Sequence, residues 1–450
     1  MNSLFIDHSI GEIIEKMDHR ELSPAEVSRI ALKNIKEQNK KYFAWVTYGS
    51  ETLFERERKQ NQIFNTGKPK LLENIPVGVK DIFNTADFPT QMGSPLWKNF
   101  TPGNDARTVF NLKRQGAIVM GKTVTAEFAV HTLGKTLNPY DITKNPGTSS
   151  SGSAVAIALG MVPTATGTQT AGSIVRPASF CGVYGCKPSF GTIPRTGTLK
   201  TTDSLDTIGF FTIHQKDLRR VFDSLSVHGK DYPISNAALS DPARQTKPKS
   251  QPWRVGLART HTWQHAPQYA KDTLEDFFKK LSKQKGIWTE EANLPGAIAQ
   301  SHQIHETIYN KTLSYYFKGE HKKSDFVSPI MNYLIESGKK IEISDYMKAV
   351  TDQNELIRKM DSFFKDFDIL ISLSTAGEAP LRDVVELPDP ALMWTLTHLP
   401  VVSVPIFRSP SGMPFGMQVV ARKYNDYLLF SFLDQLRSMQ LIPEKSSYFK

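Results

Sequence analysis

Two short polar loops and one lysine are the residues of this sequence best suited to chemistry. The first loop, residues 146–153, reads Pro-Gly-Thr-Ser-Ser-Ser-Gly-Ser, and the second, residues 167–177, reads Gly-Thr-Gln-Thr-Ala-Gly-Ser-Ile-Val-Arg-Pro. One apolar run separates them. Upstream, Lys80 follows Pro-Val-Gly-Val in a strand-like stretch, where burial of its charge would be costly. Segments with a purely structural role rarely need so much serine, glycine and threonine. The three segments therefore indicate a catalytic role.

Two other chemistries fit parts of the sequence less well. Residues 116–123 match the Gly-x4-Gly-Lys-Thr pattern, but the four central positions are apolar and predict a strand, whereas a phosphate cradle is a glycine-rich loop. The α/β-hydrolase elbow requires Gly-x-Ser-x-Gly, which neither Ser149 nor Ser173 satisfies. His131 and His398 lie in segments near the core, where a structural role is the commoner one. A nucleotide site and a Ser-His triad are therefore disfavoured.

Together the segments resemble the amidase signature family, in which a Val-Lys-Asp segment precedes a Gly/Ser-rich loop, an apolar helix and a Gly-Thr-x-Thr-x-Gly-Ser loop. The resemblance runs from Gly78 through residues 204–209 and resumes at 367–370 and 412–418, whereas the stretch from about 230 to 359 carries no motif that can be placed. It implies one α/β/α domain over residues 1–450 with a largely mixed central sheet. Its expected parts are a helical N-terminal layer (1–70), a catalytic core (71–215), a variable region (216–360) and a C-terminal core (361–450).

The resemblance also implies the roles of three side chains. Ser173 matches the nucleophile, Ser149 the bridging serine and Lys80 the general base. In the family, the serine matching Ser149 follows a cis peptide bond, so that its hydroxyl lies between lysine and nucleophile. Lys80 must be neutral to accept a proton, which desolvation by apolar neighbours would achieve by lowering its pKa. The oxyanion hole is expected from the backbone N–H groups of Thr170, Ala171, Gly172 and Ser173.

Each of these assignments has a structural alternative. From its own segment alone, Lys80 would be expected to extend to the surface beside Asp81, and the serines would be expected to cap helices or form turns. The joint presence of both serine loops reverses that expectation for Lys80, Ser149 and Ser173. For Ser150, Ser151 and Ser153, capping or turn roles remain the expectation.

The nucleophile loop departs from the commonest family form. That form has aspartate at the position of Gln169 and glycine at that of Ala171, so a charge near the nucleophile is missing. Many members have arginine two residues after the nucleophile; here Val175 occupies that position and Arg176 follows, a variant that resembles the malonamidase branch. A guanidinium binds carboxylates through a planar fork, so Arg176 is a candidate for binding an acid group of the substrate. Pairing with a structural carboxylate is an equally open alternative.

Charge and cysteine content set further bounds. The net charge of +10 could indicate a nucleic-acid or membrane partner, but the basic residues are spread along the chain and no nucleic-acid-binding pattern is present, so neither partner is expected. Cys181 and Cys186 are expected to be buried and reduced, and no neighbouring residue completes a metal set. The N-terminal segment has no long apolar stretch, which favours a cytoplasmic enzyme. No cofactor is implied.

The elements expected from the pattern alternate between strand and helix. Ser23-Pro-Ala-Glu predicts a helix start, and the charged run 51–62 predicts its exposed continuation. Strands are expected at 76–80, 117–120, 253–257, 367–372, 400–407 and 415–421, and helices at 106–115 and 154–160. Residues 231–252 contain four prolines and predict a surface connection without an element. The region that follows, through 359, is expected to be largely helical.

The sequence therefore predicts a metal-independent amidase that hydrolyses a small-molecule carboxylic amide to an acid and ammonia or an amine through an acyl-enzyme. The nearest alternative is similar to the A subunit of glutamyl-tRNA amidotransferase, which uses the same triad to deliver ammonia to a partner protein. The intact Lys80, Ser149 and Ser173 disfavour a catalytically silent binding protein. The identity of the amide and a homodimeric state stay open.

Overall fold

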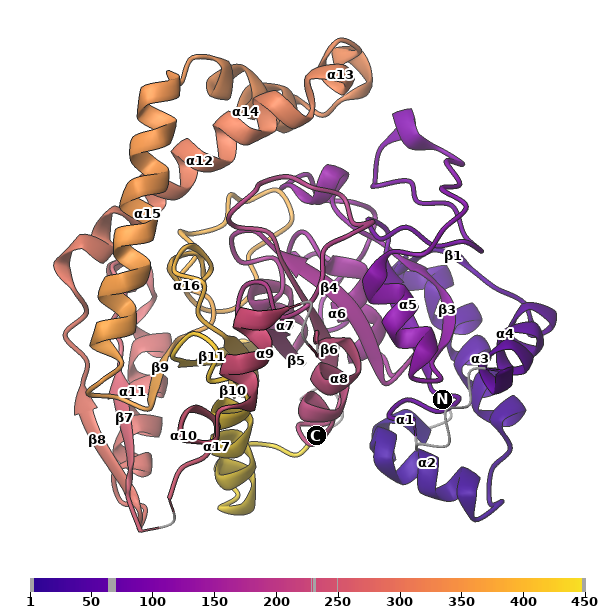
Figure 1. Cartoon of the computed structure of the whole chain (residues 1–450), viewed down its shortest axis with the longest axis horizontal. Coiled ribbons are helices and arrows are strands. Elements are labelled where there is room, and N and C mark those ends of the chain that lie inside the picture. The colour runs from indigo at the N-terminus through magenta and orange to yellow at the C-terminus, as the bar shows by residue number, and fades with distance from the viewer. Residues whose placement is uncertain (1–3, 64–69, 228, 230–231, 249, 447–450) are drawn as a thin grey trace.

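The chain folds around one long β-sheet flanked by helices (Figure 1). The computed structural model describes residues 4–63, 70–227, 229, 232–248 and 250–446. Within these residues, eleven strands follow the order β1-β3-β2-β4-β6-β5-β10-β11-β9-β7-β8. Their bounds are β1 Trp45–Tyr48, β2 Pro76–Lys80, β3 Ile118–Thr123, β4 Thr164–Gln169, β5 Tyr184–Lys187, β6 Thr207–Thr212, β7 Trp253–Leu257, β8 Ile287–Glu291, β9 Ile369–Leu373, β10 Val401–Arg408 and β11 Pro414–Ala421.

The helices fall into four groups along the chain. The N-terminal layer holds α1 Leu4–Asp7, α2 Ile10–Asp18, α3 Pro24–Tyr42 and α4 Glu51–Ile63. The centre holds α5 Arg107–Arg114, α6 Ser151–Ala158, α7 Val175–Cys181, α8 Asp217–Leu225, α9 Pro233–Ser240 and α10 Pro242–Gln245. The next group is α11 Gln268–Leu281, α12 Ser301–Tyr316, α13 Lys318–His321, α14 Pro329–Lys339 and α15 Ile343–Phe363. The last two are α16 Leu392–Leu396 and α17 Asp426–Ser438.

The sheet mixes parallel and antiparallel pairs. β2 runs parallel to β3 and β4, and β7 runs parallel to β8 and β9, whereas the other pairs are antiparallel. The α/β class and the mixed sheet expected from the sequence are confirmed. In open sheets, sites form beyond the carboxyl ends of parallel strands. Lys80 ends β2 and Gln169 ends β4, so the pairing of Gly78 with Ala165 brings the lysine beside the turn that follows β4.

The two polar loops lead directly into the buried helices α6 and α7, all of whose residues are buried. Gly147 in the first loop has φ +88°, and a side chain there would lie 2.5 Å from the Cα atom of Pro177 in α7. Only glycine allows that backbone approach. The glycine content of the first loop therefore brings it against the helix that follows the second.

Most elements expected from the pattern are present, and one expectation is wrong. The capping box at Ser23 begins α3, and residues 118–123 form strand β3 as expected in place of a phosphate loop. The expectation that 231–252 would lack an element is contradicted by α9 and α10. Pro233 and Pro242 stand in the first turn of these helices, where the missing N–H needs no partner. The prolines therefore mark helix starts.

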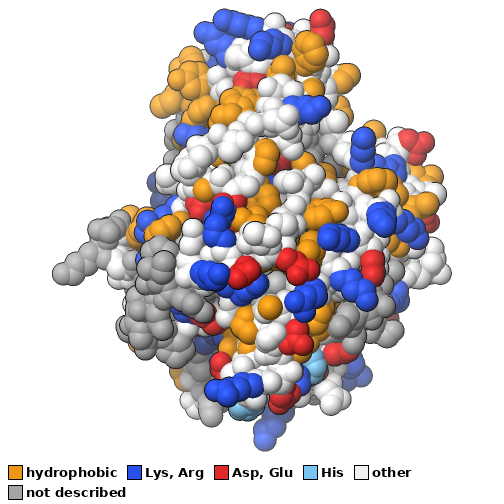
Figure 2. All heavy atoms as spheres, turned by 90° about the vertical axis from the view of Figure 1, so that its right-hand side faces the viewer, with side chains coloured by type: hydrophobic (Ala, Val, Ile, Leu, Met, Phe, Trp, Pro, Cys, Tyr) orange, Lys and Arg blue, Asp and Glu red, His pale blue; other side chains and the backbone are white. Residues whose placement is uncertain are grey.

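No helix within the described ranges is long and apolar enough to span a membrane. On the face drawn in Figure 2, basic and acidic side chains are interspersed among apolar and neutral ones.

Helices α12, α14 and α15 form an arm beside the sheet, at the upper left of Figure 1. The region expected to be largely helical is therefore confirmed as such. The packing between α12 and α14 is close at Gly338, where an added Cβ would clash with the carbonyl oxygen of Asn310. This contact fixes α14 against the helix that reaches the candidate site.

We expect Gly338→Ala to lower the free energy of unfolding by about 1–3 kcal/mol, because α14 must shift away from α12. Thermal and urea unfolding measure the effect. Gly319→Ala is the matched control, since nothing lies within 4 Å of an added Cβ there. Equal stability of the two variants would show that the backbones of α12 and α14 are not in close contact.

Candidate active site

Lys80 is fully buried at the end of β2, with its amine inside a group of hydroxyls. Its Nζ lies 2.8 Å from Ser149 Oγ, 2.9 Å from Ser150 Oγ and 2.8 Å from Thr168 Oγ1. Desolvation lowers the pKa of Lys80 well below its usual value, and the charge of Asp206 opposes this only in part. The surface-exposed alternative for this lysine does not hold, and a neutral amine is favoured.

The first loop brings two serines to that amine. The peptide bond between Thr148 and Ser149 is cis. Ser150 Oγ lies 3.2 Å from the carbonyl oxygen of Thr168, to which it donates, and it accepts from the Thr168 N–H at 3.3 Å. The sequence pattern assigns Ser150 to a cap or turn and does not single out Thr168. Both contact Lys80, a placement that the strand pairing of β2 with β4 explains and that no motif showed.

The turn between β4 and α7 holds Ser173 and the expected oxyanion donors. Ser173 is 6% exposed, so that it sits just below the surface at the start of α7. Within the described part of the chain, no hydrogen bond occupies the N–H groups of Ala171, Gly172 or Ser173. Three neighbouring N–H groups without an internal acceptor can bind one negatively charged oxygen.

Thr170 is held on both its side chain and its carbonyl. Its Oγ1 donates to Asp206 Oδ1 at 2.9 Å, and the same carboxylate accepts from the backbone N–H groups of Thr201 and Thr202. His305 Nε2 lies 2.9 Å from the carbonyl oxygen of Thr170. Burial lowers the pKa of His305 to about 4, so at neutral pH the ring is uncharged and its Nε2 carries the proton donated to that carbonyl. The resemblance includes the 204–209 segment but assigns Asp206 no role, and the sequence did not point to His305.

Arg176 is buried and ion-paired within the chain. Its Nη1 lies 2.6 Å from Glu386 Oε2, its Nη2 lies 2.6 Å from Asp389 Oδ2, and its Nη1 also donates to Thr148 Oγ1 at 3.0 Å. Burial opposes the charge, but the two carboxylates more than offset this and raise the pKa of Arg176 above its usual value. The sequence left open whether Arg176 binds an acid group of the substrate or pairs with a structural carboxylate. These contacts are those of a structural pair.

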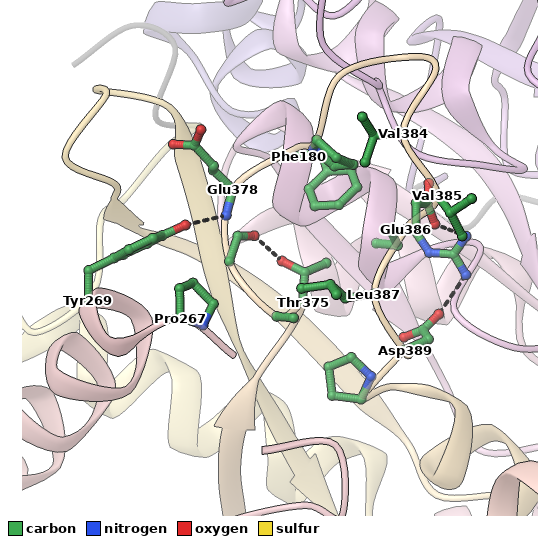
Figure 3. A pocket seen from close by; sticks show the side chains of 15 residues that line it. Phe180, Pro267, Tyr269, Thr375, Glu378, Val384, Val385, Glu386, Leu387 and Asp389 are labelled. Atoms are coloured by element: carbon green, nitrogen blue, oxygen red, sulfur yellow. Dashed lines mark hydrogen bonds and ion pairs between the residues drawn. The ribbon is translucent and has the colours of Figure 1, made fainter. Parts of the chain in front are cut away.

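A smaller cavity reaches the turn at Thr170, and a larger one lies beside α7 at Arg176 and Phe180. The smaller, of about 140 Å³, is lined by Thr168 and Thr170 together with Ala129, Lys200 and Asp206, and it is the one next to the Lys80 amine. The larger, of about 310 Å³, is drawn in Figure 3 and is bounded by Tyr269 and Pro267 on one side and by the 384–389 segment on the other. The dashed lines at Glu386 and Asp389 in that figure are the ion pairs with Arg176.

Metal-ligating side chains are not gathered at this site. Across the described ranges, no group of three or more His, Cys, Asp or Glu side chains is arranged to hold a metal ion. Cys181 and Cys186 are buried and free, as expected. Burial raises the pKa of both thiols.

The lowered pKa of Lys80 predicts a pH-dependent contribution to stability. The unfolded chain keeps this proton up to about pH 10.5, whereas the folded chain releases it at lower pH. Between the two pKa values the unfolded state therefore binds more protons, and rising pH stabilises the fold by up to about 1.4 kcal/mol per pH unit. In Lys80→Met this slope should vanish. Urea unfolding of both proteins at several pH values from about 7 to 10 measures the difference, and parallel profiles would show that the amine stays charged when buried.

Comparisons with known proteins agree with this fold. The Amidase family matches residues 26–430. The A subunit of glutamyl-tRNA(Gln) amidotransferase from Bdellovibrio bacteriovorus is 28% identical over 482 residues, which cover 97% of this chain and 98% of that protein. The structure of native peptide amidase from Stenotrophomonas maltophilia superposes with a TM-score of 0.81 at 22% identity, covering 98% of this chain and 99% of that one. A chain of a vestigial protein complex linked to the origins of an s-triazine catabolic enzyme superposes with a TM-score of 0.85 at 24% identity, covering 97% and 100%. Because the family matches residues 26–430, which are most of this chain, the chain belongs to the amidase signature family.

Proposed function

We propose that this protein hydrolyses a small carboxylic amide through an acyl-enzyme on Ser173, with Ser149 as proton relay and Lys80 as general base. The observation that carries the proposal is the buried Lys80 amine, whose Nζ lies 2.8 Å from Ser149 Oγ in a site that favours the neutral form. An uncharged amine has a lone pair to accept a proton, which an ammonium lacks.

The contacts around the amine support this direction of proton transfer. Ser150 Oγ directs its proton toward the Thr168 carbonyl, so it accepts from the amine. Thr168 Oγ1 accepts the second N–H of the neutral amine. The lone pair is then left for the hydroxyl proton of Ser149, the third neighbour.

The reaction then follows in two halves. Ser173 Oγ attacks the amide carbon while its proton passes to Ser149 and the proton of Ser149 passes to Lys80. The carbonyl oxygen becomes an oxyanion held by the free N–H groups of the turn. Lys80 returns a proton through Ser149 to the departing nitrogen, the C–N bond breaks, and ammonia or an amine leaves. Water attacks the acyl ester by the same proton route and releases the acid and Ser173.

The smaller cavity suits a small substrate. Its volume of about 140 Å³ lies below the usual range for drug-sized ligands, and the hydroxyl of Thr168, which lines it, contacts the Lys80 amine at 2.8 Å. We therefore propose that the substrate amide binds there. A small-molecule partner and the absence of a metal, a cofactor, a nucleic-acid partner and a membrane partner remain expectations of this proposal, and a homodimeric state stays open.

Ser173→Ala should abolish amide turnover while leaving thermal unfolding unchanged, because no other hydroxyl is proposed to form the acyl-enzyme. Ammonia release from a panel of small amides measures the loss of turnover, and labelling by a fluorophosphonate probe, located by peptide mass spectrometry, measures the loss of the reactive serine.

Ser149→Ala should be severely but less completely impaired in turnover, because water partly replaces the relay. Ser151→Ala, which removes a buried hydroxyl at the start of α6, is the matched control. A covalent adduct on a serine other than Ser173 would overturn the assignment.

The relatives favour a second candidate function. The Bdellovibrio protein named above and others at 27–28% identity are called the A subunit of glutamyl-tRNA(Gln) amidotransferase. An enzyme component of that kind would use the same three side chains and deliver ammonia to a partner. The ammonia-release assay separates the two functions: a free amidase turns over alone and elutes without partners, whereas an ammonia-delivering component is weak alone and co-purifies with other chains.

A variant of Arg176 tests whether the substrate carries an acid group that reaches the larger cavity, which Arg176 lines, as its malonamidase-like position suggests. If it binds such a group, Arg176→Ala should cost an acidic amide about 1.5–3 kcal/mol, or roughly tenfold to a hundredfold in kcat/KM, and cost its neutral analogue far less. Steady-state kinetics with both amides measures this. Equal losses together with a lower unfolding temperature would assign Arg176 to holding Glu386 and Asp389 in place.

A further inference from the structure

Two carbonyl groups of the turn between β4 and α7, which holds Ser173, are hydrogen-bonded by side chains from distant parts of the chain. His305 Nε2 lies 2.9 Å from the carbonyl oxygen of Thr170, and Thr395 Oγ1 donates to the carbonyl oxygen of Ala171 at 2.6 Å. These donors come from α12 and α16, which lie 135 and 224 positions further along the sequence. Neither of them belongs to the two polar loops.

A hydrogen bond to a carbonyl also sets the direction of the next N–H. The peptide group is planar and, when trans, points its C=O and N–H in opposite directions. The bond from Thr395 to the Ala171 carbonyl therefore sets the direction of the Gly172 N–H. That N–H has no acceptor within the described part of the chain and belongs to the proposed oxyanion hole.

Gln169 determines whether the Thr395 hydroxyl donates or accepts at the contact between the two side chains. Gln169 Oε1 accepts from the backbone N–H groups of Ile174 at 2.8 Å and Val175 at 2.9 Å, so its amide cannot be turned around without placing NH₂ against two donors. Its Nε2 therefore faces Thr395 and donates to Oγ1 at 2.9 Å. Thr395 must accept at that contact.

The single proton of the Thr395 hydroxyl is thereby left for a carbonyl. Two carbonyls are in reach: that of Ala171 at 2.6 Å and that of Ala391 at 3.5 Å. The shorter contact has normal hydrogen-bond length and the longer one lies at the limit. The hydrogen bonds then form a directed chain from Gln169 through Thr395 to Ala171.

A carboxylate at position 169 would not support this chain. It would still accept from the two backbone N–H groups, but it has no proton to donate to Thr395. As the stronger acceptor, it would compete for the threonine proton and leave the Ala171 carbonyl without its donor. The neutral amide in this chain is thus matched to a hydroxyl at Thr395.

We propose that Thr395, oriented by Gln169, is a positioning residue that aligns the Gly172 N–H with the oxyanion of the transition state. This inference rests on the proposed function, because it concerns a donor of the same oxyanion hole. Since the alignment acts on charge that develops only during the reaction, it should change kcat and leave KM nearly unaltered.

The test uses Thr395→Val, which keeps the shape and removes the hydroxyl, and Thr395→Ser, which keeps the hydroxyl. We expect Thr395→Val to lower kcat about tenfold to a hundredfold with KM within about threefold, and to slow fluorophosphonate labelling of Ser173 by a similar factor, because the phosphonyl oxygen uses the same donors. Thr395→Ser should stay within about threefold of the unmodified protein. Gln169→Glu should behave like Thr395→Val, and the double variant should be no slower than the slower single one, since both act on one hydrogen-bond chain.

Thr397→Val is the matched control. It removes a buried hydroxyl from the same segment, one that donates to the carbonyl of Met393. We expect its kcat and labelling rate to match those of the unmodified protein. Thermal unfolding of every variant shows which are folded, and if Thr395→Val is not, Gln169→Glu gives the same readout.

The results separate this inference from the proposed function. If the unmodified protein neither turns over amides nor is labelled at Ser173, the proposed function fails and the inference fails with it. If it is labelled and active while Thr395→Val or Gln169→Glu keeps its kcat and labelling rate, only the inference fails. Equal losses in Thr395→Val and Thr395→Ser, or a multiplicative loss in the double variant, would also overturn it.

Discussion

The buried amine of Lys80 is the constraint around which the rest of the site is arranged. An amine taken out of water at the end of a central strand needs hydrogen-bonding partners, and Ser149, Ser150 and Thr168 supply them. These partners come from the loop before α6 and from β4, so the strand pairing and the two loops must form together. Since these hydroxyls satisfy the amine without supplying a countercharge, burial lowers the pKa of Lys80 and favours the uncharged form. The requirements of a buried lysine and those of a general base thereby coincide.

The turn between β4 and α7 has the opposite character: within the described residues, the N–H groups of Ala171, Gly172 and Ser173 have no acceptor, while two of its carbonyls are held. Asp206 fixes the side chain of Thr170, and His305 and Thr395 hold two successive carbonyls. Unpaired donors at a nearly buried position are costly. The turn keeps them aligned because neighbouring elements restrict its backbone, and those neighbours belong to α12, α16 and the segment before β6.

Much of this arrangement could be predicted from the sequence, and the limits have physical causes. The strand ending at Lys80, the buried helix after the first loop and the mixed sheet follow from apolar runs, small residues and the resemblance of the three motifs, whereas α7 after the second loop was not predicted. His305 and Thr395 could not be found in this way, because a single polar residue carries no pattern and its partner lies far off in sequence. Asp206 lies within the 204–209 segment of the resemblance, which assigned it no role. For Arg176 the residue type was compatible with a substrate or a structural carboxylate, and only the fold places Glu386 and Asp389 beside it. The prolines of 231–252 misled because proline stands both in connections and at helix starts.

His305 and Thr395, which hold two carbonyls of the turn, lie far from it in sequence. This separation has a consequence for the folding of the chain during translation. The strands and loops that carry Lys80, Ser149 and Ser173 are all synthesised before residue 215, yet His305 and Thr395 lie 135 and 224 positions beyond their partners in the turn. Domains fold as they emerge, N-terminal parts first. An emerging chain therefore holds Ser173 in a turn that lacks these two hydrogen bonds until α12 and α16 have left the exit tunnel. The turn therefore reaches its final arrangement only late in translation, after Thr395 has been synthesised.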